Sequence, residues 1–189
     1  MSERILGIDP GSNITGWGVV DQSQGRLLHV DNGGIFTRAK AFQERLHEIY
    51  QGIDQVIREY EPTLVSLENV FVSKNPMSAL KLGQARGVAM IAALNRGLEI
   101  REFTPMQIKK AVVGHGRAGK EQVAMMVQAM LGLPEPAQVD ASDALAAAIC
   151  CVLQPNAALE ALLEKETKKK MRKRASRKRK ASSQKSLLG

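Results

Sequence analysis

The chain has 189 residues, of which 44% are hydrophobic, and a formal net charge of +8. This length suits one domain with a sizeable core, and no apolar run reaches the roughly 18 residues that a membrane-spanning helix needs. The first residues lack the basic-then-apolar order of a signal peptide, and the two cysteines, Cys150 and Cys151, are adjacent. We therefore expect a cytoplasmic protein with no membrane association, no disulfide and no zinc site.

The positive charge is concentrated at the end of the chain. Residues 165–189 contain 12 Lys and Arg and one acidic residue, which gives +11. The other 164 residues contain 15 basic and 18 acidic side chains, which gives −3. A basic tail of this kind is an electrostatic handle for nucleic acid and, less often, for an acidic protein or a membrane surface. Its low-complexity composition predicts disorder when the tail is alone.

The first third of the chain is predicted to form three antiparallel strands, followed by one helix. The strands are expected over residues 5–8, 15–20 and 26–30. Pro10 ends the first strand, because proline cannot donate to a strand ladder, and Gly33-Gly34 is expected to close the meander. Apolar side chains then recur every three or four positions over residues 42–60, which predicts an amphipathic helix that ends before Pro62.

The remainder of the core combines strands and helices. Strands are predicted over residues 64–68 and 98–103, and helices over residues 78–95, 105–110, 120–131 and 139–153. Helix 78–95 is rich in small residues, although glycine in a helix interior costs about 1 kcal/mol relative to alanine. We therefore expect its small-residue face to pack closely against the sheet or against a second copy of the chain.

This order of elements predicts an α/β fold, with a mixed five-stranded sheet flanked by helices. The predicted core domain spans residues 1–155, and residues 156–189 are assigned to a helical extension and the basic tail.

Four acidic residues are the candidate catalytic residues. Asp9 and Glu68 each end a predicted buried strand, and Asp140 and Asp143 share one face of a helix. Ordinary explanations exist, because Asp9 could cap a turn and acids at a helix start are favoured by the helix dipole. If the fold gathers all four, two charges about 4 Å apart repel by roughly 4 kcal/mol at an effective dielectric near 20, which requires a cation. Oxygen ligands select Mg²⁺ or Mn²⁺, and two such ions support phosphodiester hydrolysis.

Four segments resemble the RuvC-type Holliday-junction resolvases, in the same order along the chain. They are Gly7-Ile8-Asp9-Pro10-Gly11-Ser12, Leu67-Glu68-Asn69-Val70-Phe71, Ser78-Ala79-Leu80-Lys81-Leu82-Gly83-Gln84-Ala85-Arg86-Gly87 and Val139-Asp140-Ala141-Ser142-Asp143-Ala144-Leu145-Ala146. The similarity extends from about Arg4 to Leu153. It implies a ribonuclease H-like fold and a homodimer that cuts two opposed strands of a four-way DNA junction symmetrically, in recombination and DNA repair. The basic tail is not part of the usual family pattern.

The resemblance also implies roles for individual residues. The implied catalytic and metal-binding residues, which would hold two Mg²⁺ per subunit with Mn²⁺ able to substitute, are Asp9, Glu68, Asp140 and Asp143. The residues implied to contact DNA are Phe71, Lys109 and Lys120, with Phe71 at the junction centre. From the sequence alone, solvated charges are the more common explanation for the two lysines, and Phe71 could equally be an ordinary core anchor. The RuvA–RuvB branch-migration complex is the implied protein partner.

Two other classes of function stay open. An actin-like ATPase or sugar kinase also begins with a strand, an aspartate and a glycine-bearing turn, but it predicts a second phosphate-binding Asp-Gly motif and a much longer chain. A junction-binding protein without chemistry would result if the acids were merely structural. The favoured prediction is a Mg²⁺-dependent crossover junction endodeoxyribonuclease that leaves 5′-phosphate and 3′-hydroxyl ends.

Overall fold

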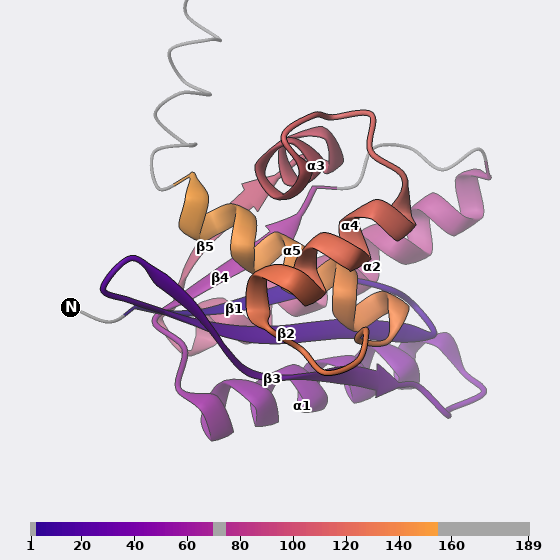
Figure 1. The fold of residues 1–189 in the computed structure, drawn as a ribbon. Coiled ribbons are helices and arrows are strands. Elements are labelled where there is room, and N and C mark those ends of the chain that lie inside the picture. The colour runs from indigo at the N-terminus through magenta and orange to yellow at the C-terminus, as the bar shows by residue number, and fades with distance from the viewer. Residues whose placement is uncertain (1–2, 70–74, 155–189) are drawn as a thin grey trace, which may run out of the picture. The chain divides into compact units, whose positions relative to one another are not determined.

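A computed structural model describes residues 3–69 and 75–154, which form one sheet and the helices around it (Figure 1). The strands are β1 (Glu3–Asp9), β2 (Ile14–Ser23), β3 (Arg26–Phe36), β4 (Leu64–Glu68) and β5 (Glu99–Phe103). The helices are α1 (Phe42–Tyr60), α2 (Pro76–Asn95), α3 (Pro105–Val113), α4 (Lys120–Leu131) and α5 (Val139–Leu153). Among these described helices, none has the length and apolar character needed to cross a membrane.

The sheet is mixed, as predicted, with the strand order β3-β2-β1-β4-β5. Strands β1, β2 and β3 form an antiparallel meander, whereas β4 runs parallel to both β1 and β5. Because β1 and β4 are parallel neighbours, their carboxyl ends lie at the same edge of the sheet. The proposed division of the chain at residue 155 falls where the described residues end, and it stays a prediction.

The third strand is longer than predicted, and this corrects the expectation that Gly33-Gly34 closes the meander. Strand β3 continues through both glycines to Phe36, with Gly33 opposite Trp17 and Gly34 opposite Gly16. A Cβ atom on Gly33 would lie 2.9 Å from the indole ring of Trp17. The glycine therefore makes room for the tryptophan, because a glycine inside a strand can mark a close approach rather than a turn.

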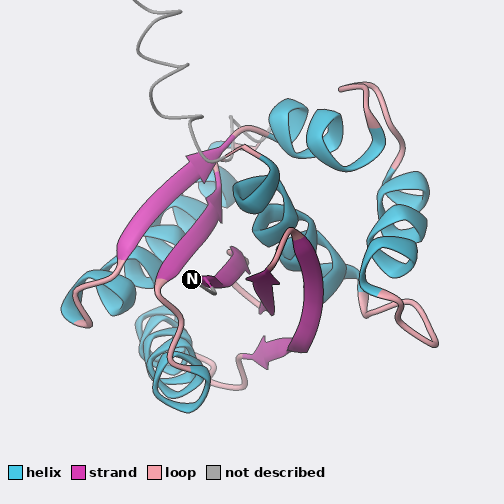
Figure 2. Ribbon diagram, turned by 60° about the vertical axis from the view of Figure 1, so that its left-hand side comes forward, coloured by secondary structure: helices cyan, strands magenta, loops and turns pink. Residues whose placement is uncertain are grey.

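Helices cover both faces of the twisted sheet (Figure 2). Helices α1 and α2 pack on one face, where Leu6 and Ile8 of β1 join Val65 and Leu67 of β4 in the main hydrophobic core. Successive side chains of a strand point to opposite faces. Gly7 of β1 and Ser66 of β4, which lie between these apolar residues, therefore face the other side of the sheet. Helix α5 covers that other face, and it is flanked by α3 and α4.

Two glycines allow α5 to lie directly on the sheet. A Cβ atom on Gly7 of β1 would stand 1.9 Å from the carbonyl oxygen of Ala144, and one on Gly16 of β2 would stand 2.0 Å from that of Asp140. The hydroxyl of Ser66 on β4 also donates a hydrogen bond of 2.6 Å to the carbonyl oxygen of Ala147. The position of α5 is thus set by its contacts with β1, β2 and β4.

The small residues of α2 are divided between two surroundings. The alanines at positions 85, 89, 92 and 93 are fully buried in the core. In contrast, a Cβ atom on Gly83 or Gly87 would meet no described atom within 4 Å beyond the nearby helix backbone. The close approach expected at these two glycines is therefore not made to the sheet, and the alternative, a second copy of the chain, stays open.

Candidate functional site

Asp9 and Glu68 occupy equivalent positions at one edge of the sheet. Each is the last residue of its strand, and each follows by two positions a residue that faces α5, namely Gly7 and Ser66. Strand alternation therefore directs both carboxylates to the α5 side of the sheet. The turn after Asp9 is closed by Thr15, whose buried hydroxyl donates to the carbonyl oxygen of Gly11 at 2.9 Å.

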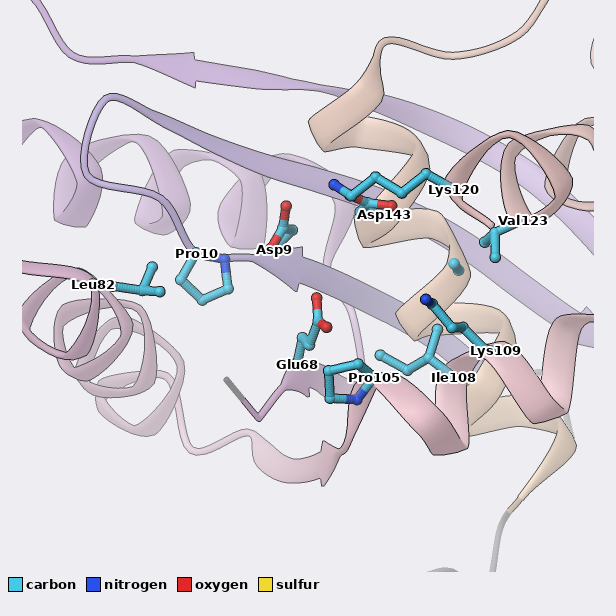
Figure 3. Close-up of a pocket in the computed structure, with 11 residues that line it drawn as sticks. Asp9, Pro10, Glu68, Leu82, Pro105, Ile108, Lys109, Lys120, Val123 and Asp143 are labelled. Atoms are coloured by element: carbon cyan, nitrogen blue, oxygen red, sulfur yellow. The ribbon is translucent and has the colours of Figure 1, made fainter. Parts of the chain in front are cut away.

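A pocket of about 310 Å³ lies beyond this edge, and it brings together groups from several elements (Figure 3). Its charged lining residues are Asp9, Glu68, Asp143, Lys109 and Lys120. Its apolar lining residues are Pro10, Leu82, Pro105, Ile108, Val123 and Ala146. In Figure 3 the carboxyl groups of Asp9 and Glu68 extend from neighbouring strand ends into the space beside Asp143 on α5. Five of the seven predicted site residues therefore line one pocket.

The two remaining predicted residues stand differently. Asp140 does not line the pocket, but it lies one helical turn before Asp143 on α5, and its charge acts on Asp9. Phe71 lies outside the described residues, and its predicted position at the junction centre stays a prediction.

The pocket disfavours a negative charge on Asp9. Burial, followed by the charges of Glu68, Asp143 and Asp140, raises the pKa of Asp9 to about 7, from an ordinary value of 3.8, while Lys120 acts in the opposite direction. Burial and the Asp143 carboxylate raise the pKa of Glu68 as well, and here Lys120 and Lys109 oppose the shift. Burial and neighbouring negative charges both raise the pKa of a carboxyl group. The acids are therefore electrostatically coupled, as expected for carboxylates that share one site.

Lys120 partly neutralises the acidic pocket. Its ammonium group donates a hydrogen bond of 3.0 Å to Oδ2 of Asp143 and forms an ion pair with it. This bond, together with the charge of Asp143, raises the pKa of Lys120. The Lys120 side chain is 74% exposed, whereas that of Asp143 is 22% exposed. The lysine therefore reaches the site from the solvent side and leaves the carboxylate at the pocket wall.

The candidate ligands suit a hard divalent cation, although the carboxylates do not surround a single point. All the candidate ligands are carboxylate oxygens, which suit Mg²⁺ and Mn²⁺, and a bound cation would relieve the repulsion that raises the pKa of Asp9. Within residues 3–69 and 75–154, however, no group of three Asp, Glu, His or Cys side chains is arranged to hold a metal ion. Asp143 is paired with Lys120, so a cation held by Asp143 would take the place of this lysine.

Sequence reasoning missed the residues that position the acids. Ser66 is fully buried, and its hydroxyl joins β4 to α5, so it links the strand that carries Glu68 to the helix that carries Asp143. A polar residue two positions before Glu68 in an otherwise apolar strand was the available signal. The apolar pocket wall, to which α2 contributes Leu82 and α4 contributes Val123, has no recognisable signal in the sequence, because only the fold brings these helices together.

Comparison with known proteins gives one consistent result. The model of the family described as crossover junction endodeoxyribonuclease RuvC matches residues 5–151. The protein of that name from Trichlorobacter lovleyi is 60% identical over 148 residues, which cover 78% of this chain and 83% of that protein. Its counterpart from Geobacter sulfurreducens is 56% identical over 148 residues, which cover 78% and 90%.

Solved structures agree with the sequence comparison. RuvC from Thermus thermophilus is 31% identical with a TM-score of 0.73, and the match covers 82% of this chain and 96% of that one. The complex of Thermus thermophilus RuvC with a Holliday junction substrate gives 32% identity and a TM-score of 0.77, with the same coverage. The yeast mitochondrial Holliday junction resolvase, at 11% identity and a TM-score of 0.61, shares the fold. The predicted ribonuclease H-like fold is confirmed.

Proposed function

Because this chain belongs to the RuvC family of crossover junction endodeoxyribonucleases, we propose that it resolves four-way DNA junctions by cutting two opposed strands symmetrically, in recombination and repair. The observation that carries this proposal is the pocket itself. Three separate elements, β1, β4 and α5, deliver Asp9, Glu68 and Asp143 to one space, and two lysines line the same space. Family membership argues against an actin-like ATPase or sugar kinase.

The four acids divide the work of holding divalent cations. Asp9 and Glu68 stand on rigid strand ends, while Asp143 and Asp140 stand on a helix whose position is set by close contacts with the sheet. These carboxylates would hold the Mg²⁺ of the active enzyme, two ions per subunit, with Mn²⁺ as a substitute. When bound, such cations activate a water molecule and stabilise the departing 3′ oxygen of a phosphodiester, leaving 5′-phosphate and 3′-hydroxyl ends.

The two lysines bind the DNA backbone beside the acids. Lys109 is half-buried on α3, and Lys120 is exposed at the start of α4, on the same pocket. If Asp143 held a cation, Lys120 would lose its ion pair with this carboxylate and would then be available to a phosphate oxygen. Phe71 belongs to the proposal as an aromatic contact at the junction centre, on the strength of the family resemblance.

Two opposed cuts require two sites, and α2 offers the surface for a second copy. Gly83 and Gly87 are open, and four large apolar residues of α2 are more than half exposed, namely Met77, Leu80, Ile91 and Leu94. A groove of about 530 Å³ is lined by Leu46, His47, Tyr50, Gln84, Gly87, Val88 and Ile91. We assign this surface of α1 and α2 to an isologous homodimer contact. The RuvA–RuvB complex in the cytoplasm is the proposed partner.

A cleavage assay tests this function. The protein is incubated with a synthetic mobile four-way junction in Mg²⁺, and then in Ca²⁺, beside an ATPase measurement. Paired symmetrical cuts in Mg²⁺ are expected, and neither cleavage in Ca²⁺ nor ATP hydrolysis. The variants Asp9→Asn, Glu68→Gln, Asp140→Asn and Asp143→Asn should each lose cleavage and keep junction binding, because a ligand is lost while the DNA surface is kept.

The same assay identifies the alternative. Junction binding without cleavage by the unaltered protein in Mg²⁺ or Mn²⁺ would establish a non-catalytic junction-binding protein. Near-normal cleavage by one of the four variants would remove that residue from the site.

A further inference from the structure

Arg86 of α2 contacts the strand end that carries Glu68. Its Nε atom donates to the main-chain carbonyl oxygen of Glu68 at 3.4 Å, and its Nη2 atom donates to Oε1 of Glu102 on β5 at 2.5 Å. Arg86 and Glu102 also form an ion pair, and the Arg86 side chain is 21% exposed. One guanidinium group therefore connects α2 to the carboxyl ends of two neighbouring parallel strands.

Among the described residues, the end of β4 pairs with β5 but not with β1. The ladder between β1 and β4 stops at the pair Ile8–Leu67, one residue before Glu68. On the β5 side, the pair Glu68–Phe103 is the last, and the amide of Asn69 donates to the carbonyl oxygen of Phe103 at 2.7 Å. Arg86 thus contacts Glu68 at the point where β4 no longer pairs with β1.

We propose that Arg86 is a positioning residue, which holds the backbone of Glu68 so that its carboxylate is presented to the divalent cation. Strand alternation directs the Glu68 side chain to the α5 face, whereas Arg86 approaches its carbonyl group from α2, which packs on the opposite face of the sheet. Arginine suits this role because its planar fork serves a carbonyl oxygen and a carboxylate at once, which the single ammonium group of lysine does not. The inference rests on the proposed cation site.

Glu102 holds the guanidinium in place. The contact between Arg86 and the carbonyl oxygen is long, at 3.4 Å, so the short, charge-assisted bond to Glu102 fixes the orientation of the fork. Glu102 lies opposite Leu67 in the β4–β5 ladder, next to the site strand but outside the pocket. Removing the Glu102 charge therefore loosens Arg86 without altering any proposed ligand.

The test measures cation affinity in the absence of DNA. Isothermal titration of Mn²⁺ into the full-length protein is compared for the unaltered chain, Arg86→Gln, Arg86→Lys, Glu102→Gln and Glu68→Gln. Loss of a group that orients a ligand lowers metal affinity about 10–100-fold, and this loss is expected for Arg86→Gln, with a smaller one for Glu102→Gln. Arg86→Lys should recover only part of the affinity. In junction cleavage, the Mg²⁺ concentration for half-maximal rate should rise, while the rate at saturating Mg²⁺ returns toward that of the unaltered protein.

Arg101→Gln is the matched control. Arg101 lies on β5, its side chain is also 21% exposed, and it forms an ion pair of 2.8 Å with Glu99. Its removal should leave Mn²⁺ affinity unchanged. Mn²⁺ affinity within twofold of the unaltered value in folded Arg86→Gln would overturn the proposal. If that variant does not fold, unchanged affinity in Glu102→Gln overturns it. Absence of Mn²⁺ binding by the unaltered protein would instead refute the cation site itself, and the role of Arg86 with it.

Discussion

The carboxyl group of Asp9 links the chemistry of the site to the stability of the fold. Its pKa is raised to about 7 by burial and by the neighbouring carboxylates, whereas the unfolded chain releases this proton near 3.8. A group with a raised pKa binds more protons in the folded state than in the unfolded state. The protonated Asp9 carboxyl therefore contributes its full stabilisation of the fold below about pH 4, and this stabilisation is lost as the pH rises toward 7. In the absence of cations, the ionised Asp9 destabilises the fold.

Substitution of this residue should reveal the effect directly. In EDTA at pH 8, Asp9→Asn is expected to be more stable than the unaltered protein by on the order of 2 kcal/mol, after allowance for screening by solvent and by Lys120. At pH 4 the two proteins should be about equally stable, and urea unfolding at pH 4, 6 and 8 measures the difference. Added Mn²⁺ should stabilise the unaltered protein more than the variant.

A distant carboxylate serves as the control for this prediction. Arg96 donates hydrogen bonds to Asp54 at the surface and lowers its pKa, so Asp54→Asn should reduce stability at pH 8. If Asp9→Asn also reduced stability at pH 8, the Asp9 charge would not be a destabilising one.

At the scale of elements, α5 is held on the sheet by direct backbone contact. Gly16→Ala would place a Cβ atom 2.0 Å from the carbonyl oxygen of Asp140, and a backbone atom cannot move without its helix. We expect a loss of about 1–3 kcal/mol in the free energy of unfolding, and a loss of junction cleavage because α5 carries two acids. Thermal denaturation and the cleavage assay measure the two effects.

Gly119→Ala provides the comparison for this substitution. A Cβ atom there would lie 3.8 Å from Oε1 of Gln122, an ordinary contact, so only the weaker N-cap preference of alanine at the start of α4 remains, and stability should fall by less than about 1 kcal/mol. A Gly16→Ala variant as stable and active as Gly119→Ala would contradict the assigned role of the α5 contact.

Elements with local signals were predictable from the sequence. Helix α1 follows from its apolar period, and α3 begins where Thr104 and Pro105 predict a helix start, with a capping box between Thr104 and Gln107. The extent of β3 was not predictable, because glycine indicates either a turn or a close approach. Only Trp17, which is distant in sequence, decides between them at Gly33.

The candidate site shows the same limit. The four acids could be predicted from motifs, and the two on α5 share a helix face by spacing alone. Their placement next to Asp9 depends on contacts made by Gly7 and Gly16 with the α5 backbone, which no local pattern reveals. The pairing of Lys120 with Asp143 likewise depends on how α4 lies beside α5.

At the scale of the whole molecule, the proposed dimer predicts the effect of filling the groove on α2. Gly87→Leu should give monomers or a loosened dimer, because the added side chain enters the apolar groove that a second copy would occupy. Cleavage of the two opposed strands should then lose its coordination, and single nicks should accumulate. Sedimentation at micromolar concentration, with and without junction DNA, measures the association.

A leucine placed elsewhere controls for added hydrophobicity. Lys110 is exposed on α3, away from the groove, and Lys110→Leu should leave the sedimentation behaviour unchanged. A monomeric unaltered protein, in the presence and in the absence of DNA, would rule out the dimer.

The charge distribution along the chain leads to a separate prediction about DNA affinity. Residues 165–189 carry a net charge of +11, and the preceding 164 residues carry −3. Most long-range attraction to DNA must therefore come from the tail. Its sequence contains no aromatic residue for stacking on bases, so its contribution should be independent of DNA sequence and structure.

Deletion of residues 168–189 should weaken binding to duplex and junction DNA alike. If roughly five of the tail's Lys and Arg side chains meet phosphates, counterion release adds about 4 to the slope of log affinity against log salt. Between 50 and 200 mM salt this corresponds to a factor on the order of 10² in affinity, which the truncated protein should no longer show. Preference for junctions and the cleavage chemistry should survive, because the acids and lysines of the pocket all precede the deletion. An unchanged salt slope in the truncated protein would instead assign the tail to a spacer or to a partner protein, since a segment that does not meet phosphates releases no counterions.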